Sequence, residues 1–365
     1  MTILLILSML VQLVYWFYYF NSLTTIHSSG PALNPIKAKD SIVPVSVIIC
    51  AKNAATQLDA HLPLVLQQNH QNYEVNLVDD FSTDQTSEII KKIDNEKRML
   101  FVHKVKQNNV GKKQALWVGI VNSRHNWVIL TDADCRPRST QWIQAMMQTR
   151  TSPNHRLILG YSPYCTNKTL VSWWSHFEAW ITALLYLSFA HRGRPYMGVG
   201  RNLCYDKSLL TKEYLDRYAH LASGDDDLTV MQMATPENTT ICLDPNSFVE
   251  TDAEPSWAAY FRQKRRHFST ASSYAPTTIA LLSGFSMSQL AFYGLILWQL
   301  FSGGALIALV LYLLRLAFIL PIVNKLRRRL QAEFHLLLFP LLDLALASYY
   351  LIFSFSVLFP KKKSW

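Results

Sequence analysis

The chain has 365 residues, of which 50% are hydrophobic and only 16% are charged, and its formal net charge is +10. Such a length allows one or two domains, and such a composition is typical of membrane proteins. The basic runs Lys325–Arg329 and Lys361–Lys363 flank apolar segments that suit membrane spans, so they suit anionic lipid headgroups better than nucleic acid. We therefore expect a membrane partner and no nucleic-acid partner.

Five cysteines are scattered through the chain without CxxC spacing. This odd and unclustered number argues against a disulfide framework and against a zinc site. It indicates a reducing environment. We therefore expect the soluble part of the chain on the cytoplasmic side of the plasma or inner membrane.

Apolar segments at both ends predict a multi-pass membrane protein. Residues 3–20 lack a positively charged start and a cleavage site, so they are interpreted as an uncleaved transmembrane anchor and not as a signal peptide. Residues 277–323 are interrupted at Gly303 and Gly304. This length suits two spanning helices joined by a tight turn.

The last apolar segment, residues 333–359, allows two interpretations. A further span would place Lys361–Lys363 outside, against the preference of lysine and arginine for the cytoplasmic side, whereas the other interpretation is a re-entrant hairpin bent near Pro340. Asp343 lies within this segment. It is either an intramembrane functional residue or a carboxylate that faces another helix or reaches the interface.

Between the apolar ends, strand-like and helix-like patterns alternate. Short runs of β-branched and other apolar residues predict strands at residues 44–50, 73–78, 100–105 and 127–130, with helical patterns in the intervals. This alternation predicts an α/β fold with a mostly parallel, doubly wound sheet. The expected domains are an anchor at residues 1–22, a catalytic domain at 43–270 and a transmembrane region at 271–365.

Acidic pairs follow two of the predicted strands. Asp79 and Asp80 come after the second strand, and Asp132 and Asp134 come after the fourth. Because ligands of such sheets bind beyond the carboxyl ends of the strands, the two pairs are expected at one edge of the sheet. A turn that leaves a strand can aim Asp132 and Asp134 at one hard cation, Mg²⁺ or Mn²⁺; a capped turn is the alternative.

Further residues suit a nucleotide diphosphate. At least one of Asp79 and Asp80 is expected to accept hydrogen bonds from a base or ribose, whereas the other can cap the turn with Ser82. Gly111 and Lys112 open a predicted helix, and a helix N-terminus beside a lysine suits an anionic diphosphate. A solvated surface lysine is an equally good interpretation of Lys112.

Asp225, Asp226 and Asp227 open another predicted helix. Acidic residues are favoured in the first turn of a helix, so capping is one interpretation. Three consecutive carboxylates also repel one another, which should raise at least one pKa toward the range of a general base. We favour this second interpretation.

The basic run Arg262–His267 lies among aromatic residues and predicts an amphipathic helix. Gln263 and Arg266 are one turn apart on one face, where arginine's planar guanidinium suits a departing diphosphate. A stripe that binds lipid headgroups is the alternative. Upstream, Ser172–Arg192 is interpreted as an interfacial helix lining an acceptor cleft, with a core helix as the alternative, and Gly198–Asn202 as a tight loop lining a site.

With these residues in place, residues 43–270 resemble the family 2 glycosyltransferases of the GT-A fold. The family pattern is a first strand entering a donor loop, an Asp pair, a DxD, a later (E/D)D and Q/RxxRW. The corresponding residues here are Val45–Ile49, Asp79–Asp80, Asp132–Asp134, Asp225–Asp226 and Gln263–His267. All of these motifs occur in order, which makes the resemblance specific.

The resemblance implies an inverting transfer from a nucleotide-diphosphate sugar, with a UDP-sugar as the expected donor. It implies that Asp79 contacts the base and that Asp132 and Asp134 hold the ribose and the metal–diphosphate. Asp226 is implied as the general base. Asp225 takes the place of the family's usual glutamate, so the choice among the three aspartates stays open.

The last motif bears on the acceptor. The resemblance implies that Gln263 and Arg266 lie near the diphosphate and the acceptor. His267 replaces a tryptophan that helps to hold the growing chain in processive polysaccharide synthases. This replacement and the few C-terminal spans favour single transfers. Ceramide glucosyltransferase-like members have a similar layout, so we expect a lipid or lipid-linked acceptor.

Three alternatives remain. A processive or short-run polysaccharide synthase of the poly-N-acetylglucosamine or hyaluronan type would extend a saccharide acceptor. A catalytically silent membrane scaffold would have kept the fold without needing the acidic motifs. A metal-dependent phosphohydrolase would use the DxD but would give the basic motif no role.

Overall fold

The computed structural model describes residues 1–26, 43–94, 99–105, 111–217, 224, 226–268, 270 and 273–356. Packing divides the chain into two units. The sheet unit comprises His27–Cys165 and Gly193–Asp252, and the helix unit comprises Met1–Ile26, Thr166–Arg192 and Ala253–Trp365. Part of the segment predicted as catalytic domain therefore packs with the apolar helices. The domain boundaries at residues 43 and 270 stay a prediction, because packing does not test where a catalytic part ends.

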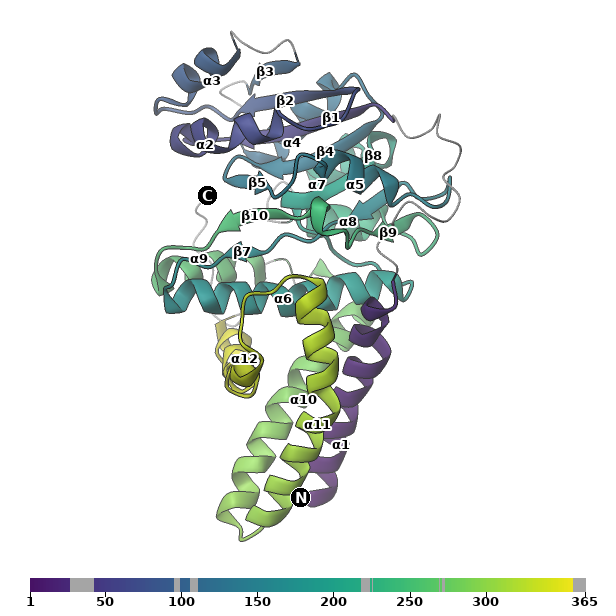
Figure 1. Ribbon diagram of the computed structural model, residues 1–365, viewed down its shortest axis with the longest axis vertical. Coiled ribbons are helices and arrows are strands. Elements are labelled where there is room, and N and C mark those ends of the chain that lie inside the picture. The colour runs from purple at the N-terminus through teal and green to yellow at the C-terminus, as the bar shows by residue number, and fades with distance from the viewer. Residues whose placement is uncertain are drawn as a thin grey trace. The chain divides into compact units, whose positions relative to one another are not determined.

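A seven-stranded, mainly parallel sheet forms the centre of the sheet unit (Figure 1). In spatial order its strands are β3 (Leu100–Lys104), β2 (Tyr73–Asp79), β1 (Val45–Ala51), β4 (Trp127–Asp132), β8 (Leu203–Asp206), β6 (Leu157–Leu159) and β9 (Thr239–Ile241). The first four strands are parallel, and β8 runs antiparallel between β4 and β6. This confirms the predicted α/β fold with a mostly parallel sheet.

Helices cover both faces of this sheet. They are α2 (Ala55–Val65), α3 (Thr86–Asp94), α4 (Lys112–Asn122) and α5 (Trp142–Gln148). Side chains of α2, α3 and α5 share one core cluster with Val47 of β1 and Leu77 of β2, whereas α4 packs in another cluster with Val78. Because successive residues of a strand point to opposite faces, α4 covers the face opposite to the other three helices. A sheet covered on both faces explains why β1 is apolar along nearly its whole length.

A smaller sheet begins directly after the acidic turn that follows β4. Its order is β5 (Cys135–Pro137), β10 (Val249–Asp252) and β7 (Tyr164–Cys165). Arg136 of β5 and Arg138, the residue just after β5, both pair with Glu250 of β10. Arg136 Nη2 also lies 3.0 Å from Asp252 Oδ1. These ion pairs anchor the chain just beyond Asp134. The short helices α7 (Lys212–Arg217) and α8 (Asp227–Met233) complete the described part of this unit.

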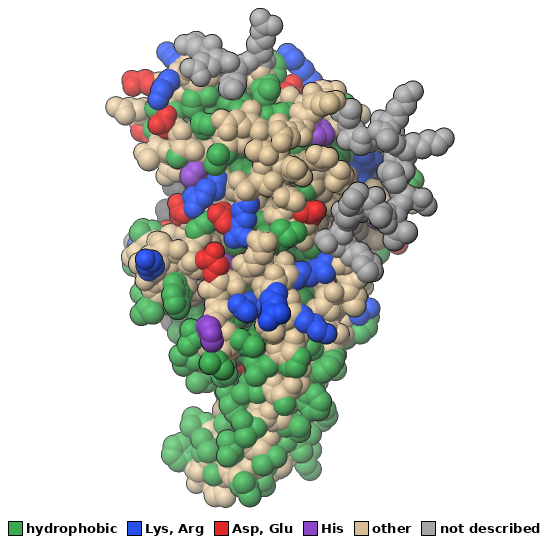
Figure 2. Space-filling view, in the orientation of Figure 1, with side chains coloured by type: hydrophobic (Ala, Val, Ile, Leu, Met, Phe, Trp, Pro, Cys, Tyr) green, Lys and Arg blue, Asp and Glu red, His purple; other side chains and the backbone are tan. Residues whose placement is uncertain are grey.

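The helix unit contains long apolar helices. Its helices include α1 (Thr2–Val14), α6 (Leu170–His191), α9 (Trp257–Phe268), α10 (Pro276–Phe301), α11 (Ala305–Arg329) and α12 (Phe339–Ser356). Within the described residues, four segments are long and apolar enough to cross a membrane: Thr2–Thr24, Pro276–Phe301, Ala305–Arg329 and Leu336–Phe353. α1, α10 and α11 run side by side, and on the face shown in Figure 2 the lower part of these helices exposes mainly hydrophobic side chains.

The C-terminal apolar segments settle two points of local structure. α10 and α11 are joined by a tight turn at Gly303, as predicted, and its φ of +83° lies in the left-handed region that glycine adopts without strain. α12 starts at Phe339 with Pro340 in its first turn, where proline is tolerated, so it is one continuous helix and not a hairpin bent at Pro340. In Figure 1 α12 is seen end-on, so it crosses the direction of α1, α10 and α11. Lys361–Lys363 lie outside the described residues.

α6 corrects the prediction of an interfacial helix. Most of its side chains are buried, with exceptions such as Trp173, which is 46% exposed. Its residues are apolar on all sides, and a helix of this kind packs inside a protein and does not lie on a surface. Both polar residues noted in its sequence have partners. His176 Nε2 accepts the backbone N–H of Glu333 at 2.9 Å, and Glu178 pairs with Lys264 of α9.

A buried ion pair links four apolar helices of this unit. Arg315 Nη1 of α11 lies 2.6 Å from Asp343 Oδ2 of α12, and both side chains are fully buried. Arg315 also donates to Gln12 of α1 and Gln289 of α10, and Asp343 accepts from Gln289 and Tyr293 of α10. Of the interpretations open for Asp343, the structure therefore shows a carboxylate that faces other helices.

We expect Asp343→Asn to lower the free energy of unfolding by about 3–5 kcal/mol, because Arg315 would keep a buried charge without its counterion. The double variant Arg315→Met/Asp343→Leu removes both charges and should recover much of this loss. Thermal unfolding of the detergent-solubilised protein measures both effects, with Lys325→Met, an exposed cation of α11, as the control. An Asp343→Asn protein that melts with the wild type would contradict the stabilising role of the pair.

Candidate functional site

The two acidic pairs converge on one edge of the main sheet because of the register of its strands. β1 lies between β2 and β4, with Ala51 opposite Asp79 and Cys50 opposite Asp132. Asp79 and Asp132 therefore leave the sheet at nearly the same level. The strand order also reverses between β1 and β4, which is the usual place of a ligand crevice in an open α/β sheet.

Asp79 is buried and caps the turn that follows β2. Its Oδ1 accepts the backbone N–H of Ser82 at 3.0 Å, and its Oδ2 accepts the hydroxyl of Ser87 at 3.3 Å. The turn-capping contact with Ser82 that was expected for one residue of this pair is thus made by Asp79. Its contact with a nucleotide base stays a prediction.

Asp80 connects the end of β2 with the start of α4. Its Oδ1 accepts the backbone N–H of Gly111 at 2.9 Å, and Lys52 Nζ lies 3.8 Å from Oδ2. Burial raises the pKa of Asp80; the Gly111 N–H and the Lys52 charge oppose this shift, and the neighbouring Asp79 adds to it. Asp80 therefore holds the residue before Lys112 at the edge of the sheet.

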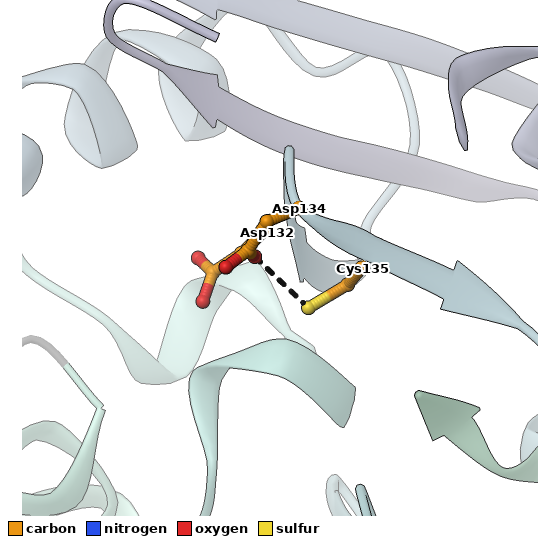
Figure 3. Close-up of side chains that lie close together, drawn as sticks. All are labelled: Asp132, Asp134 and Cys135. Carbon is orange, nitrogen blue, oxygen red and sulfur yellow. Dashed lines mark hydrogen bonds between the residues drawn. The ribbon is translucent and has the colours of Figure 1, made fainter. Parts of the chain in front are cut away.

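Asp132, Asp134 and Cys135 gather directly after β4 (Figure 3). One oxygen or sulfur atom of each residue lies within 4.8 Å of those of the other two. Cys135 Sγ donates to Asp134 Oδ1 at 3.3 Å, and burial, with the charges of Asp134 and Asp132, holds the pKa of this thiol well above its usual value. The thiol stays protonated at neutral pH and orients Asp134. The two carboxylates are thus the groups that fit a hard cation such as Mg²⁺ or Mn²⁺.

A small pocket collects predicted site residues from distant parts of the sequence. Lys112, Asp132 and Asp226 all line it, together with Gly200. Lys112 Nζ lies 2.9 Å from Asp132 Oδ1, so α4 directs its first lysine toward the acidic turn. The structure therefore brings together a cation, one carboxylate of the DxD and one carboxylate of the third acidic motif.

Asp226 is held by backbone N–H groups on both of its oxygens. Oδ1 accepts the N–H of Asp227, at the start of α8, and Oδ2 accepts the N–H of Gly200, each at 2.9 Å. Asp227 is itself buried and accepts the N–H of Leu228 at 2.8 Å. Asp226 thus caps a helix and lines the pocket at the same time. Asp225 lies outside the described residues, so its role stays a prediction.

The basic motif lies on α9 in the helix unit, whereas the acidic motifs belong to the sheet unit. Gln263 Nε2 donates to Glu254 at 3.0 Å, and Arg266 is exposed. Lys264 differs from its basic neighbours because it is buried in an ion pair with Glu178, which docks α9 on α6. Contacts of Gln263 and Arg266 with a diphosphate or an acceptor stay a prediction.

One cation beside the acidic turn is not predicted by any sequence motif. Arg201 stands in the loop Gly198–Asn202, and its guanidinium lies 4.7 Å from the centre of the Tyr164 ring. Burial opposes its charge, yet interactions with Tyr164, Cys135 and the two carboxylates of the DxD raise its pKa. Only the glycines of the loop mark this region in the sequence.

Comparison with known proteins agrees with this arrangement. Residues 46–218 match the sequence model described as Glycosyl transferase family 2. Over 90 residues the chain is 36% identical to an uncharacterized glycosyltransferase of Rickettsia bellii and 34% identical to one of Rickettsia felis. Each match covers 25% of this chain but only 13% and 14% of those proteins, so the chain matches a small part of their length.

The fold is similar to that of the mannosyltransferase PcManGT from Pyrobaculum calidifontis, whose structure contains GDP-Man and Mn²⁺. The TM-score is 0.56 at 16% sequence identity, and the alignment covers 96% of this chain and 99% of that chain. At this identity the similarity concerns the fold. With the family match and the apolar helices near both ends, it confirms the predicted GT-A fold with terminal membrane-type helices.

The raised pKa of Asp80 gives stability a pH dependence. The folded chain holds this proton more tightly than the unfolded chain, whose aspartate has a pKa near 3.8, so stability falls as the pH rises through the raised value. Asp80→Asn removes the charge but keeps an oxygen for the Gly111 N–H. We expect its stability relative to the wild type to improve as the pH rises above about 4 and then to level off.

Melting temperatures of the detergent-solubilised proteins between pH 4 and 7 measure this difference. Asp80→Ala, which lacks the acceptor, should be less stable than Asp80→Asn by about 1 kcal/mol throughout. Asp59→Asn, on an exposed carboxylate, is the control. A constant difference between Asp80→Asn and the wild type across this range would show that burial of Asp80 does not govern the effect.

Proposed function

We propose that the chain, whose residues 46–218 match the model of glycosyl transferase family 2, is a membrane-bound, metal-dependent and inverting glycosyltransferase. It moves a sugar from a nucleotide-diphosphate sugar to a lipid or lipid-linked acceptor in single transfers. The observation that carries this proposal is the pocket lined by Lys112, Asp132 and Asp226. These side chains supply a cation for a diphosphate, a carboxylate for a metal and a carboxylate for proton transfer.

The donor is assigned to the acidic turn after β4 and the start of α4. Asp132 and Asp134 would hold Mg²⁺ or Mn²⁺, which when bound neutralises charge on the diphosphate. Lys112 adds a cation at a helix N-terminus, a favourable place for phosphate. Asp79 and Asp80 shape the adjoining turns and are assigned to the base and ribose. A UDP-sugar is the donor implied by the sequence motifs; the GDP-Man in PcManGT makes a GDP-sugar the second donor to test.

Asp226 is assigned as the general base. The Gly200 N–H fixes one of its oxygens and the start of α8 fixes the other, so the carboxylate is held in one orientation. It can then accept the proton of an acceptor hydroxyl while that oxygen attacks the anomeric carbon opposite the diphosphate, which inverts the configuration. Asp225 and Asp227 are the alternatives, although Asp227 is buried and already accepts a backbone N–H.

Gln263 and Arg266 are assigned to the departing diphosphate and the acceptor. An arginine suits this role because its planar guanidinium can donate two parallel hydrogen bonds to a phosphate. His267, in place of the motif's tryptophan, supports single transfers over processive synthesis. The burial of Lys264 also weakens the alternative of a uniform headgroup-binding stripe, because its charge is paired inside the unit.

The apolar helices of the helix unit support the proposed acceptor and the proposed location in the cell. Its four apolar segments support a multi-pass protein of the plasma or inner membrane and an acceptor with an apolar chain. The sheet unit is assigned to the cytoplasm. All five cysteines are free, in keeping with a reducing compartment.

We expect Asp134→Ala and Asp226→Asn each to lower sugar transfer by on the order of 10²–10⁴-fold, because each removes a charge that acts on the reacting groups. Asp226→Asn keeps an oxygen for the Gly200 N–H and loses only the acceptor for the Asp227 N–H, so the fold should survive with a small loss of stability. Asp59→Ala, on an exposed carboxylate that pairs with Lys92 at 3.2 Å, is the control.

Transfer from a radiolabelled nucleotide sugar in the presence of Mn²⁺ measures the effect, and the melting temperature of each variant excludes unfolding. Full activity in either variant would remove that residue from the mechanism. A wild-type protein that neither transfers nor hydrolyses any donor and does not bind nucleotide with metal would support the scaffold alternative.

The acceptor class can be tested with membranes from cells that express the chain. Incubation with a panel of radiolabelled UDP- and GDP-sugars, followed by extraction of lipids, should place the label in the organic phase. Membranes that carry Asp134→Ala are the matched control. Label confined to an insoluble polymer would instead favour a polysaccharide synthase.

A further inference from the structure

Arg201 is a cation that the sheet unit holds in place while using little of its hydrogen-bonding capacity. The side chain is half-buried, and its guanidinium stacks on Tyr164 of β7 at 4.7 Å. Among the described residues, its only hydrogen bond is a long one, 3.5 Å, to the carbonyl oxygen of Ser162. An arginine has five N–H donors, and a half-buried one normally finds acceptors for them. Most donors of Arg201 are thus available to a ligand.

The position of Arg201 indicates the charge of that ligand. Its charge interacts favourably with Asp134 and Asp132, yet it forms no ion pair with them in the described part of the chain. Lys112, in contrast, lies 2.9 Å from Asp132. A residue that served only to neutralise the acidic turn would be expected to make a similar direct contact. Arg201 instead keeps its guanidinium near the carboxylates but stacked on an aromatic ring, which leaves its edge available.

The loop that carries Arg201 also connects it with the assigned base. Gly200, the preceding residue, donates its N–H to Asp226 Oδ2 at 2.9 Å and lines the pocket with Asp132. A Cβ at this position would approach the Asp226 Cβ to 3.2 Å, so the absence of a side chain permits the close contact. Gly200 thus contacts Asp226, the carboxylate assigned to proton transfer, and the next residue, Arg201, places a cation beside the DxD.

We propose that Arg201 is a donor-binding residue whose guanidinium binds the diphosphate of the nucleotide sugar and stabilises it as it departs. This inference rests on the proposed function and assigns a further residue to the same site. The ligand class is a nucleoside diphosphate, because the phosphate oxygens supply the anionic acceptors that the guanidinium lacks in the described structure. When the bond between the anomeric carbon and the diphosphate breaks, the bonding electrons stay on the diphosphate oxygen, and a fixed cation nearby stabilises that charge.

The test compares the binding of a nucleotide with the binding of Mn²⁺ alone. Loss of the Arg201 side chain should weaken nucleotide binding but should not weaken Mn²⁺ binding. With Mn²⁺ present, Arg201→Ala should bind UDP or GDP about 10–100-fold more weakly, the loss expected for hydrogen bonds to a charged group. The loss for UMP or GMP should be smaller. Mn²⁺ alone should bind Arg201→Ala as tightly as the wild type or more tightly, because a positive charge beside its carboxylate ligands is gone.

Isothermal titration calorimetry of the full-length protein in detergent measures nucleotide binding, and electron paramagnetic resonance of free Mn²⁺ measures the metal alone. Arg124→Ala is the matched control. Arg124 also stacks on an aromatic ring, 4.0 Å from the centre of Phe101, but it lies just before β4, at the end of that strand remote from the acidic turn. Arg201→Lys keeps the charge and loses the planar fork, so its nucleotide affinity should fall between those of the wild type and Arg201→Ala.

The outcomes separate this inference from the proposed function. Wild-type protein that binds neither UDP nor GDP with Mn²⁺ would overturn the proposed donor and this inference together. A nucleotide that binds equally tightly to the wild type and to Arg201→Ala would overturn this inference alone. A parallel loss of nucleotide and Mn²⁺ binding in Arg201→Ala would also overturn it, because it would show that Arg201 only supports the structure of the acidic turn.

Discussion

The parallel pairing of β1 with β2 on one side and β4 on the other is the constraint on which the proposed site depends. Backbone hydrogen bonds set Asp79 opposite Ala51 and Asp132 opposite Cys50. A slip of one residue along β4 would turn Asp132 toward the other face of the sheet, away from the pocket. Such a slip would also displace the fully buried Ile129 from its core cluster. The packing of the hydrophobic core therefore fixes the position of Asp132, although the Asp132 side chain is not part of that core.

In the helix unit, buried ion pairs have the organising role that strand register has in the sheet unit. Apolar helices in a membrane gain little from hiding apolar surface, because lipid is equally apolar, so polar contacts decide which helix faces meet. Arg315 and Asp343 supply such a contact with partners on four helices. Lys264 and Glu178 form a second buried ion pair of this unit, which joins α9 and α6, two helices outside the four candidate spans. Lys264, which belongs to the basic motif, thus holds α9 against α6.

The sequence predicts those parts of the fold that depend on neighbouring residues. β-branched runs identify the first four strands of the sheet, and carboxylates directly after a strand identify the acidic turn, because both signals are local. Contacts between distant residues are not predicted. Arg315 with Asp343 and Arg201 with Tyr164 each join separate elements, and neither arginine belongs to a motif. α6 shows a third limit, since its tryptophans suit both an interface and a core, and its burial depends on the helices around it.

The charges of the proposed donor complex can be balanced by residues of the sheet unit until the sugar leaves. In the sheet unit, Asp132 and Asp134 offset the charge of a divalent metal, and Lys112 and Arg201 offset the two negative charges of a nucleotide-diphosphate sugar. The donor complex is then close to neutral and stable in a half-buried pocket. As the sugar leaves, the diphosphate gains one further negative charge, which these four residues do not offset. A cation that acts only at that moment lowers the barrier without tightening the ground state. The proposal assigns this role to Arg266, whose charge is not among the four that balance the bound donor.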